Sequence, residues 1–285
     1  MATSTAASAT SLDGFHATRA AQRTDELVRA FFDAVNDDDE TRIDELVDRG
    51  FLSYDVHGTR SRTGLKAYYA DLRRSFSELR LEVHETVGVL VEGDRAAART
   101  IITGAHTGDY AGVAPTGTPF QTSASHIFRV RDDQLVEHWQ VVDTYRILAT
   151  IGAIPGVANV FQEQILGVPP SPGGVFEERL GTDFGDLGGR RITREESLAA
   201  VRRLYDGVIA TGRATQTHIV AENNRVASRS VWDGTITESR RAADFTTLDF
   251  FRIEDGLIAE HWESVDWVGA YQSVGLLSDD IKESQ

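Results

Sequence analysis

The chain contains an internal repeat, in which two stretches far apart in the sequence align without a gap. Residues 126–152 (HIFRVRDDQLVEHWQVVDTYRILATIG) and 249–275 (DFFRIEDGLIAEHWESVDWVGAYQSVG) are related by an offset of 123 positions. Both carry the pattern E-H-W-x-x-V-D at the same distance from an F-R-[VI] segment, which chance does not place twice in one chain. The period is far longer than the roughly 20–50 residues of solenoid repeats. We therefore infer that the chain holds two copies of one domain.

The repeat extends upstream after one change of offset. Arg95 and Arg99 correspond to Arg225 and Arg229 at an offset of 130. The second copy has therefore lost about seven residues between this strand and the gapless segment that begins at residue 126 in the first copy. The missing residues lie opposite a Gly/Pro-rich loop of the first copy, residues 110–120. The second copy is thus a shortened version of the first.

Within the first copy, the hydrophobic pattern has the period of a helix and then changes to that of a strand. The spacing predicts a helix over 24–36, a second helix that Gly50 ends, and a third from Leu65 to Phe76. Four segments then alternate with period two and are expected to be strands: 81–91, 95–106, 120–130 and 135–143. This order predicts an α+β fold, in which helices pack on a curved antiparallel sheet and leave a cone-shaped pocket between them.

The connections predict two hairpins and unequal copies. Asp132-Asp133 and Asp255-Gly256 have the composition of tight turns between paired strands. In the second copy the helical part is poor, because PPSPGG (169–174) interrupts it and only 194–208 has a clear helical pattern. The predicted organisation is a disordered lead-in (1–19), a first domain (20–152), a linker with a worn helix (153–175), a trimmed second domain (176–277) and a tail (278–285).

Composition excludes several classes of function. The net charge of −15 disfavours nucleic acid and anionic membranes as partners. With no cysteine in 285 residues, thiolate catalysis, iron–sulfur clusters and Cys-ligated zinc are excluded. No apolar run approaches the roughly 20 residues that span a bilayer, and the first residues lack the apolar core of a signal peptide. We expect a cytoplasmic protein that binds neither membranes nor nucleic acid.

Searches for cofactor and metal motifs find no candidate. The sequence has no GxGxxG or Walker loop in a suitable context, no GxSxG elbow and no HExxH helix. The acidic run at residues 37–40 lacks the spacing of a calcium loop. We therefore expect neither a cofactor nor a metal ion.

The predicted helices, the curved sheet and the closing E-H-W-x-x-x-D strand, followed by a short apolar helix that ends in glycine, resemble the SnoaL-like polyketide cyclases. These proteins share the cone-shaped fold of nuclear transport factor 2. The resemblance covers nearly all of residues 20–152 and, more loosely, 154–277. It implies a cofactor-free acid–base site in a mostly apolar cone, where an aspartate on the closing strand moves the proton for an intramolecular aldol ring closure.

In this chain the aspartate position of the family matches Asp143, with Asp266 as its repeat equivalent. An apolar pocket would raise the pKa of such a carboxyl and make it a better base near neutral pH. His126 or His57 could donate a hydrogen bond to the enolate. A competing interpretation is that Asp143 only caps the helix that begins after it. We also expect Trp139, Tyr54, His57, Phe128, Tyr68 and Phe32 to bind the substrate.

Strand alternation predicts which side chains share a face. Trp139 should point the same way as Asp143, and His138 should point the other way. We interpret the second face as the outer one. The two copies should then pack as an intramolecular pseudo-dimer through His138, Gln140, His261 and Glu263, with a further homodimer as an open alternative.

The repeat also predicts which copy is active. Opposite His126, His57 and Tyr54 of the first copy stand Asp249, Gly188 and Gly185 of the second. The first copy is therefore the expected site, and its substrate is expected to be a hydrophobic, polyketide-like carbonyl compound that is cyclised or isomerised. Two alternatives remain open: a non-catalytic module for small-molecule binding or assembly, and an epoxide hydrolase on the same fold, which would need an Asp-Arg-Asp constellation.

Overall fold

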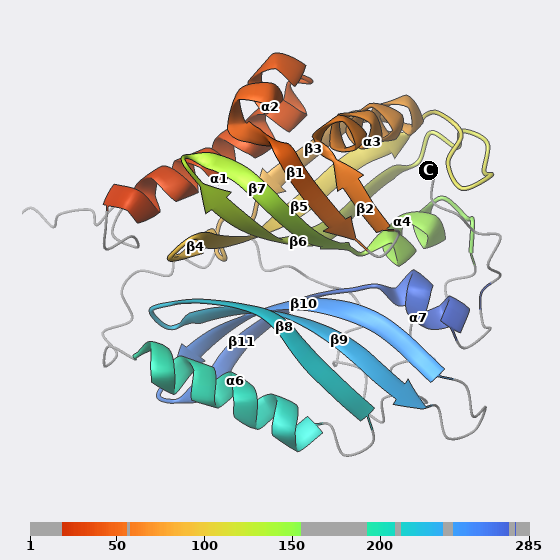
Figure 1. Ribbon diagram of the computed structural model, residues 1–285. Helices are drawn as coiled ribbons and strands as arrows, with labels where there is room; N and C mark the ends of the chain where they lie inside the picture. Colours follow the sequence, from red (N-terminus) through yellow and green to blue (C-terminus); the bar gives the residue numbers. More distant parts are fainter. Residues whose placement is uncertain are drawn as a thin grey trace, which may run out of the picture.

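The computed structural model of the protein describes residues 19–55, 58–154, 193–208, 212–235, 242–273 and 277. The predicted lead-in, linker and tail lie almost entirely outside these residues, and so does His57. Both halves of the repeat are represented by a helix-covered sheet (Figure 1).

The first domain combines helices with a mixed sheet. Its helices are α1 (Arg19–Asn36), α2 (Glu40–Leu46), α3 (Arg62–Ser75) and α4 (Thr144–Thr150). Its strands are β1 (Val47–Asp55), β2 (Gly58–Ser61), β3 (Phe76–Val83), β4 (Val89–Glu92), β5 (Arg95–His106), β6 (Pro119–Arg131) and β7 (Gln134–Val142). They lie in the order β2-β1-β7-β6-β5-β3, with β4 paired to β5. All these pairs are antiparallel except β1 with β7, which is parallel.

Two predicted boundaries are wrong. Gly50 does not end the second helix: α2 ends at Leu46, and Gly50 lies within β1. Val47 is already extended and pairs with Leu135 of β7, so pairing within the sheet overrides the local helical pattern. The predicted strand 81–91 is two strands, β3 and β4, separated by a turn in which Gly88 adopts φ +65°.

The second domain repeats the latter half of the first. It has α6 (Arg194–Val208), β8 (Gly212–Glu222), β9 (Arg225–Thr235), β10 (Ala242–Glu254), β11 (Leu257–Val265) and α7 (Trp267–Ser273). The strands form an antiparallel sheet in the order β11-β10-β9-β8. Helix α6 covers one face of this sheet through Leu198 and Val201, which pack on Val226 and Phe251.

The two hairpins that the sequence predicts are present, one in each domain. Both hairpins have two-residue turns with positive φ at each position: 51° and 57° at Asp132 and Asp133, and 49° and 75° at Asp255 and Gly256. Positive φ at both positions is the geometry of a type I′ turn, whose twist suits paired strands. The predicted hairpins are therefore confirmed.

The two sheets face each other, with α1, α2 and α3 outside the first and α6 outside the second (Figure 1). Apolar side chains of both sheets fill the space between them, and repeat equivalents contribute from each side, such as Ile127 with Phe250 and Ala97 with Ala227. The full set is Val87, Leu90, Ala97, Ile127 and Val141 of the first domain and Val220, Ala227, Leu248 and Phe250 of the second, flanked by Trp139 and Trp262.

Polar contacts across this contact surface follow the same approximate two-fold symmetry. The backbone N–H of Val91 donates to Glu222 (3.2 Å), and that of Ala221 donates to Glu92 (3.0 Å). Glu92 and Glu222 are repeat equivalents, so the two bonds are reciprocal. A further contact does not follow the repeat: the buried hydroxyls of Ser125 and Ser264 lie 2.8 Å apart, and their repeat equivalents are Leu248 and Val141.

The expectation that His138 and Gln140 form this contact is wrong. His138 is fully buried on the opposite face of the first sheet, where its ring packs against Phe31, Phe51 and Phe128. The contact instead uses the face that carries Trp139 and Val141. The strand pattern correctly predicted that His138 and Trp139 lie on opposite faces of the sheet. The error was in which face is the outer one, because α1 covers the face that carries His138.

Replacing Phe250 by alanine tests how much the contact between the sheets contributes to the free energy of unfolding. Phe250 is 1% exposed, and a fully buried Phe→Ala change costs about 3–5 kcal/mol of unfolding free energy. The control is Leu257→Ala, at a side chain that is 70% exposed, with an expected change within about 0.5 kcal/mol. Denaturant titrations of the full chain should separate the two variants. Equal effects would contradict the packing described here.

Candidate functional site

A line of four hydrogen-bonded side chains crosses the first sheet beneath its helices. Ser53 Oγ lies 3.0 Å from His138 Nδ1, and His138 Nε2 lies 3.0 Å from His126 Nδ1. His126 Nε2 in turn lies 3.0 Å from Thr100 Oγ1. These residues belong to β1, β7, β6 and β5, which are consecutive in the sheet. All four are at most 1% exposed.

Aromatic rings enclose this line, namely Phe31, Phe32, Phe51 and Phe128. Burial lowers the pKa of His126 to about 3. Burial, and secondly the neighbouring His126, hold the pKa of His138 well below its ordinary value. Both imidazoles are therefore neutral at pH 7. Each of their four nitrogens has a partner, so the line is a satisfied polar core rather than a pair of free bases.

A second polar group adjoins this line on the same face. Gln140, the cross-strand partner of His126, donates to Asp55 at 3.3 Å. Asp55 also pairs with Arg60, and the guanidinium of Arg60 lies 4.6 Å from the ring centre of Tyr68. Tyr68 is thus held beside charged groups rather than beside His126.

On the other face, Trp139 joins the two domains. Its ring stacks on that of Tyr54 with centroids 5.4 Å apart. The ring of His218 from the second domain lies 4.1 Å from it on centroids. Trp139 and Tyr54 therefore belong to the contact between domains and not to the interior of the first cone.

Asp143 lies where the first closing strand meets α4, at the junction of the two domains. Its backbone N–H donates to Ser123 (3.0 Å), and its carboxylate accepts from the N–H of Arg146 at 3.3 Å, which caps α4. Asp266 caps α7 in the same way through Gly269 at 2.9 Å. Both aspartates therefore cap the helix that follows them.

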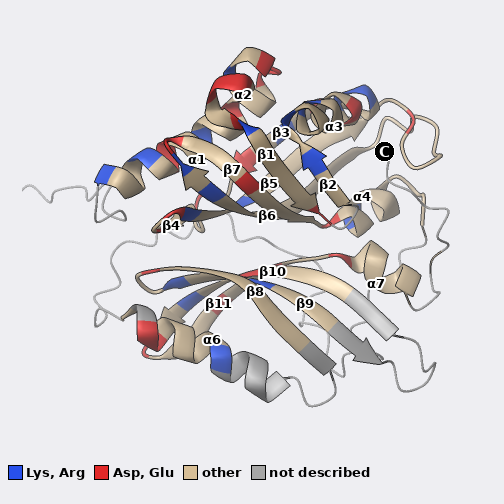
Figure 2. Ribbon diagram, in the orientation of Figure 1, with Lys and Arg blue, Asp and Glu red and all other residues tan. Residues whose placement is uncertain are grey.

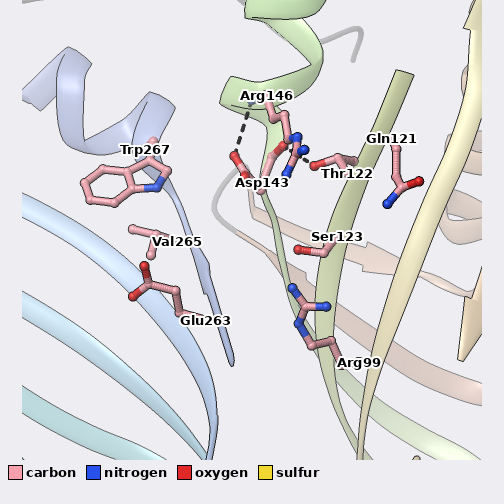
Figure 3. Close-up of a pocket in the computed structure, with 9 residues that line it drawn as sticks. All are labelled: Arg99, Gln121, Thr122, Ser123, Asp143, Arg146, Glu263, Val265 and Trp267. Carbon is pink, nitrogen blue, oxygen red and sulfur yellow. Dashed lines mark hydrogen bonds between the residues drawn. The ribbon is translucent and has the colours of Figure 1, made fainter. Parts of the chain in front are cut away.

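Asp143 also lines a cleft between the domains (Figure 3). Asp143 enters it from the start of α4 and Glu263 from β11, while Arg99 reaches it from β5. The remaining lining residues are Gln121, Thr122, Ser123, Arg146, Val265 and Trp267. The space within it is ≈ 30 Å³, room for about two water molecules. It is a small polar cleft formed by both domains.

The electrostatics of the cleft favour proton transfer. Burial raises the pKa of Asp143 to about 6, against the opposing effects of the Arg146 N–H and of the Arg146 and Arg99 charges. Burial also raises the pKa of Glu263, and the charges of Asp249 and Asp143 add to this. Arg99 is 1% exposed and permanently cationic, so it can stabilise a negative charge that develops beside the two carboxyls.

The structure thus separates the two predicted catalytic residues. Asp143 faces the cleft between the domains, and His126 lies on the opposite face of the sheet with Phe32 and Phe128. Phe32 also borders a surface depression of ≈ 530 Å³ between α1 and β3, whose lining is mostly charged. His57 lies outside the described residues.

Sequence reasoning missed the residues that complete the cleft. Arg99 was visible only as a repeated arginine, and its equivalent Arg229 gave no hint of a facing carboxyl. Glu263 was expected at the contact between the two copies, and the structure places it in the cleft between the domains, opposite Asp143. Its proximity to Asp143 depends on how the two domains pack, which no local pattern specifies.

Comparisons with known proteins bear on both halves of the chain. Residues 25–151 match the model of the SnoaL-like polyketide cyclases, and residues 171–261 match that of a SnoaL-like domain. This chain is a SnoaL-like protein with two such domains in tandem. The comparison with curated proteins found no match.

Solved structures similar to this SnoaL-like protein each span about half of it. IdmH from Streptomyces antibioticus is 26% identical, with 46% of this chain and 99% of IdmH covered and a TM-score of 0.42. AclR from Streptomyces galilaeus is 27% identical, with 47% and 98% covered and a TM-score of 0.43. A SnoaL-like protein from Jannaschia sp. CCS1 is 25% identical, with 50% and 100% covered and a TM-score of 0.45.

Among the described helices, none has the length and apolar composition needed to cross a membrane. Charged side chains are instead distributed over the helices and the strand ends of both domains (Figure 2).

The buried histidines should make the protein less stable in acid. The folded-state pKa of His126 is about 3, below the value of about 6.5 in an unfolded chain, so the unfolded state takes up the proton first as the pH falls. Each such histidine removes about 1.4 kcal/mol of unfolding free energy per pH unit between these values. Denaturant titrations between pH 6.5 and 4.5 should show a smaller slope for His126→Asn than for the wild type, and identical slopes would contradict a neutral, buried imidazole.

Proposed function

We propose that the chain is a cofactor-free acid–base enzyme, with Asp143 as the proton acceptor. Its reaction is proton abstraction from a hydrophobic carbonyl compound of the polyketide type, followed by aldol-type cyclisation or isomerisation. The observation that carries this proposal is the carboxyl of Asp143, raised in pKa to about 6 within a cleft that also holds Arg99. A general base is most effective when its pKa lies near the working pH.

Each step has a group in the cleft that can perform it. The carboxylate of Asp143 takes the proton next to the substrate carbonyl. The guanidinium of Arg99 balances the charge of the resulting enolate. From the sequence we had expected His126 or His57 to stabilise the enolate. The protonated Asp143 can then return the proton to the product, which regenerates the base.

The size of the cleft limits how a substrate can bind. With room for about two water molecules, it admits only the reacting carbonyl end. The apolar bulk of the substrate then lies outside, next to Trp267, a partly exposed residue of the second domain at the cleft. The second copy is in this account a part of the site, not a degenerate partner.

A second reaction class, epoxide opening by water, is favoured by one specific observation. Arg99 shares the water-sized cleft with two carboxyls of raised pKa, Asp143 and Glu263. One ionised carboxyl can activate a water while the other, protonated, donates to the epoxide oxygen. Incubating the protein with an apolar epoxide in ¹⁸O-labelled water separates the two classes, because only hydrolysis places labelled oxygen in the product.

Asp143→Asn is the direct test of the proposed base. Asparagine keeps the shape and can still cap α4, but it cannot accept the proton, so turnover should fall about 10²–10⁴-fold. The readout is α-proton exchange in D₂O, followed by NMR on a hydrophobic 1,3-dicarbonyl probe. Asp266→Asn is the matched control, because it removes the same charge from the equivalent cap of α7.

Three outcomes would contradict the role of Asp143 as the base. Equal losses in Asp143→Asn and Asp266→Asn would exclude a single site. A collapse of the melting temperature in Asp143→Asn alone would assign the residue to capping. Binding of the probe without any exchange in the wild type would favour the non-catalytic module.

The pH profile provides an independent test. A base must be ionised to accept a proton, so the exchange rate should rise with pH, with a midpoint at about 6 set by Asp143. Below this midpoint the rate should fall about tenfold per pH unit. Steady-state rates between pH 4.5 and 8 measure the profile, and a rate that stays nearly flat down to pH 4.5, as the ordinary aspartate pKa of about 3.9 would give, would contradict the assignment.

A further inference from the structure

The second domain carries three potential metal ligands on one face of its sheet. Asp249 of β10 is the direct cross-strand partner of Glu263 on β11. His261 lies two residues before Glu263 and therefore points to the same face. One ligand atom from each of these three side chains lies within 4.8 Å of the other two.

These three positions are where the two copies differ in chemistry. Asp249, His261 and Glu263 are the repeat equivalents of His126, His138 and Gln140, at the common offset of 123. In the first domain the three positions are occupied by neutral side chains, sealed under helices and bonded to one another or to neighbouring groups. In the second domain two of them are carboxylates, and the histidine side chain is 38% exposed.

We propose that Asp249, His261 and Glu263 bind a divalent transition metal ion, such as Zn²⁺ or Mn²⁺. One imidazole and two carboxylates form a mixed nitrogen and oxygen set, which suits these ions. Bonds of about 2.0–2.2 Å place ligand atoms about 3–4 Å apart, so small movements of the side chains close the site. Three protein ligands leave further positions for water.

A supporting set of hydrogen bonds orients the buried ligand. Thr247 Oγ1 donates to Asp249 Oδ2 at 2.7 Å, and Trp232 Nε1 donates to Thr247 Oγ1 at 3.1 Å. His261 Nε2 lies 2.9 Å from Asp249 Oδ1, where a bound cation would take the place of the shared proton. Partners of this kind fix the orientation of a ligating carboxylate and are a regular feature of metal sites.

The local charge also favours a cation. Asp249 and Glu263 are both carboxylates and face each other across β10 and β11. His261, paired with Asp249 at 2.9 Å, and Arg99, which lines the same cleft as Glu263, offset part of this negative charge. Asp143 adds a further negative charge near Glu263, although Arg146 partly balances it.

Titration calorimetry of the full chain with ZnCl₂ and with MnCl₂, after dialysis against EDTA, tests the proposal. The wild type should bind one equivalent. Asp249→Asn and Glu263→Gln should each lower the affinity by more than 100-fold, whereas Thr247→Val, which removes only a supporting bond, should lower it about 10–100-fold. The control Glu254→Gln removes an exposed carboxylate from the same strand, β10, and should leave binding unchanged.

Two further measurements keep the test decisive. Substitution with Co²⁺ should give visible absorption bands in the wild type that Glu263→Gln loses. Melting curves in EDTA show whether each variant folds, and if Asp249→Asn does not, the partly exposed Glu263 still decides the outcome. Absence of binding in the wild type, or equal binding by wild type, Asp249→Asn and Glu263→Gln, would overturn the proposal.

Discussion

The apolar contact between the two sheets is the constraint on which the rest of the structure depends. Each domain covers one face of its sheet with its own helices and leaves the other face apolar. In the first domain that open face carries Ile127, Trp139 and Val141. A monomeric domain would expose them as a large apolar patch, which soluble proteins rarely tolerate. The covalent tandem supplies a matching surface at high effective concentration.

The candidate active site is a consequence of that contact. Asp143 stands at the edge of the packed faces, so the second domain supplies Glu263 and Trp267 opposite it. The same burial that removes the apolar faces from water raises the pKa of Asp143 to about 6. A duplicated fold therefore produces a cleft that neither copy forms alone, and the approximate symmetry is broken by which side chains enter it.

Much of the fold could be predicted from the sequence, because its determinants are local. The repeat, the hairpins at Asp132-Asp133 and Asp255-Gly256 and the caps at Asp143 and Asp266 follow from turn and capping chemistry over a few residues. The end of α2 could not be predicted, since pairing of β1 with the distant β7 decides it.

The site was less predictable, for a different physical reason. Alternation shows that Trp139 and His138 occupy opposite faces, but not which face the helices cover. A polar histidine is ordinarily expected outside the core, yet His138 is buried because Ser53 and His126 satisfy its ring nitrogens. Asp249, His261 and Glu263 escaped motif searches because their proximity comes from cross-strand register and not from a short spacing in the sequence.

The central claim is that the two sheets pack face to face, and one engineered cross-link tests it most directly. The hydroxyls of Ser125 and Ser264 lie 2.8 Å apart across the contact, in a chain without cysteine. Mild oxidation of a Ser125→Cys/Ser264→Cys variant should form one intramolecular disulfide, leave no titratable thiol and raise the melting temperature above that of the reduced form. The Ser125→Cys single variant should keep its free thiol. A folded double variant in which both thiols remain free after oxidation would contradict the packing.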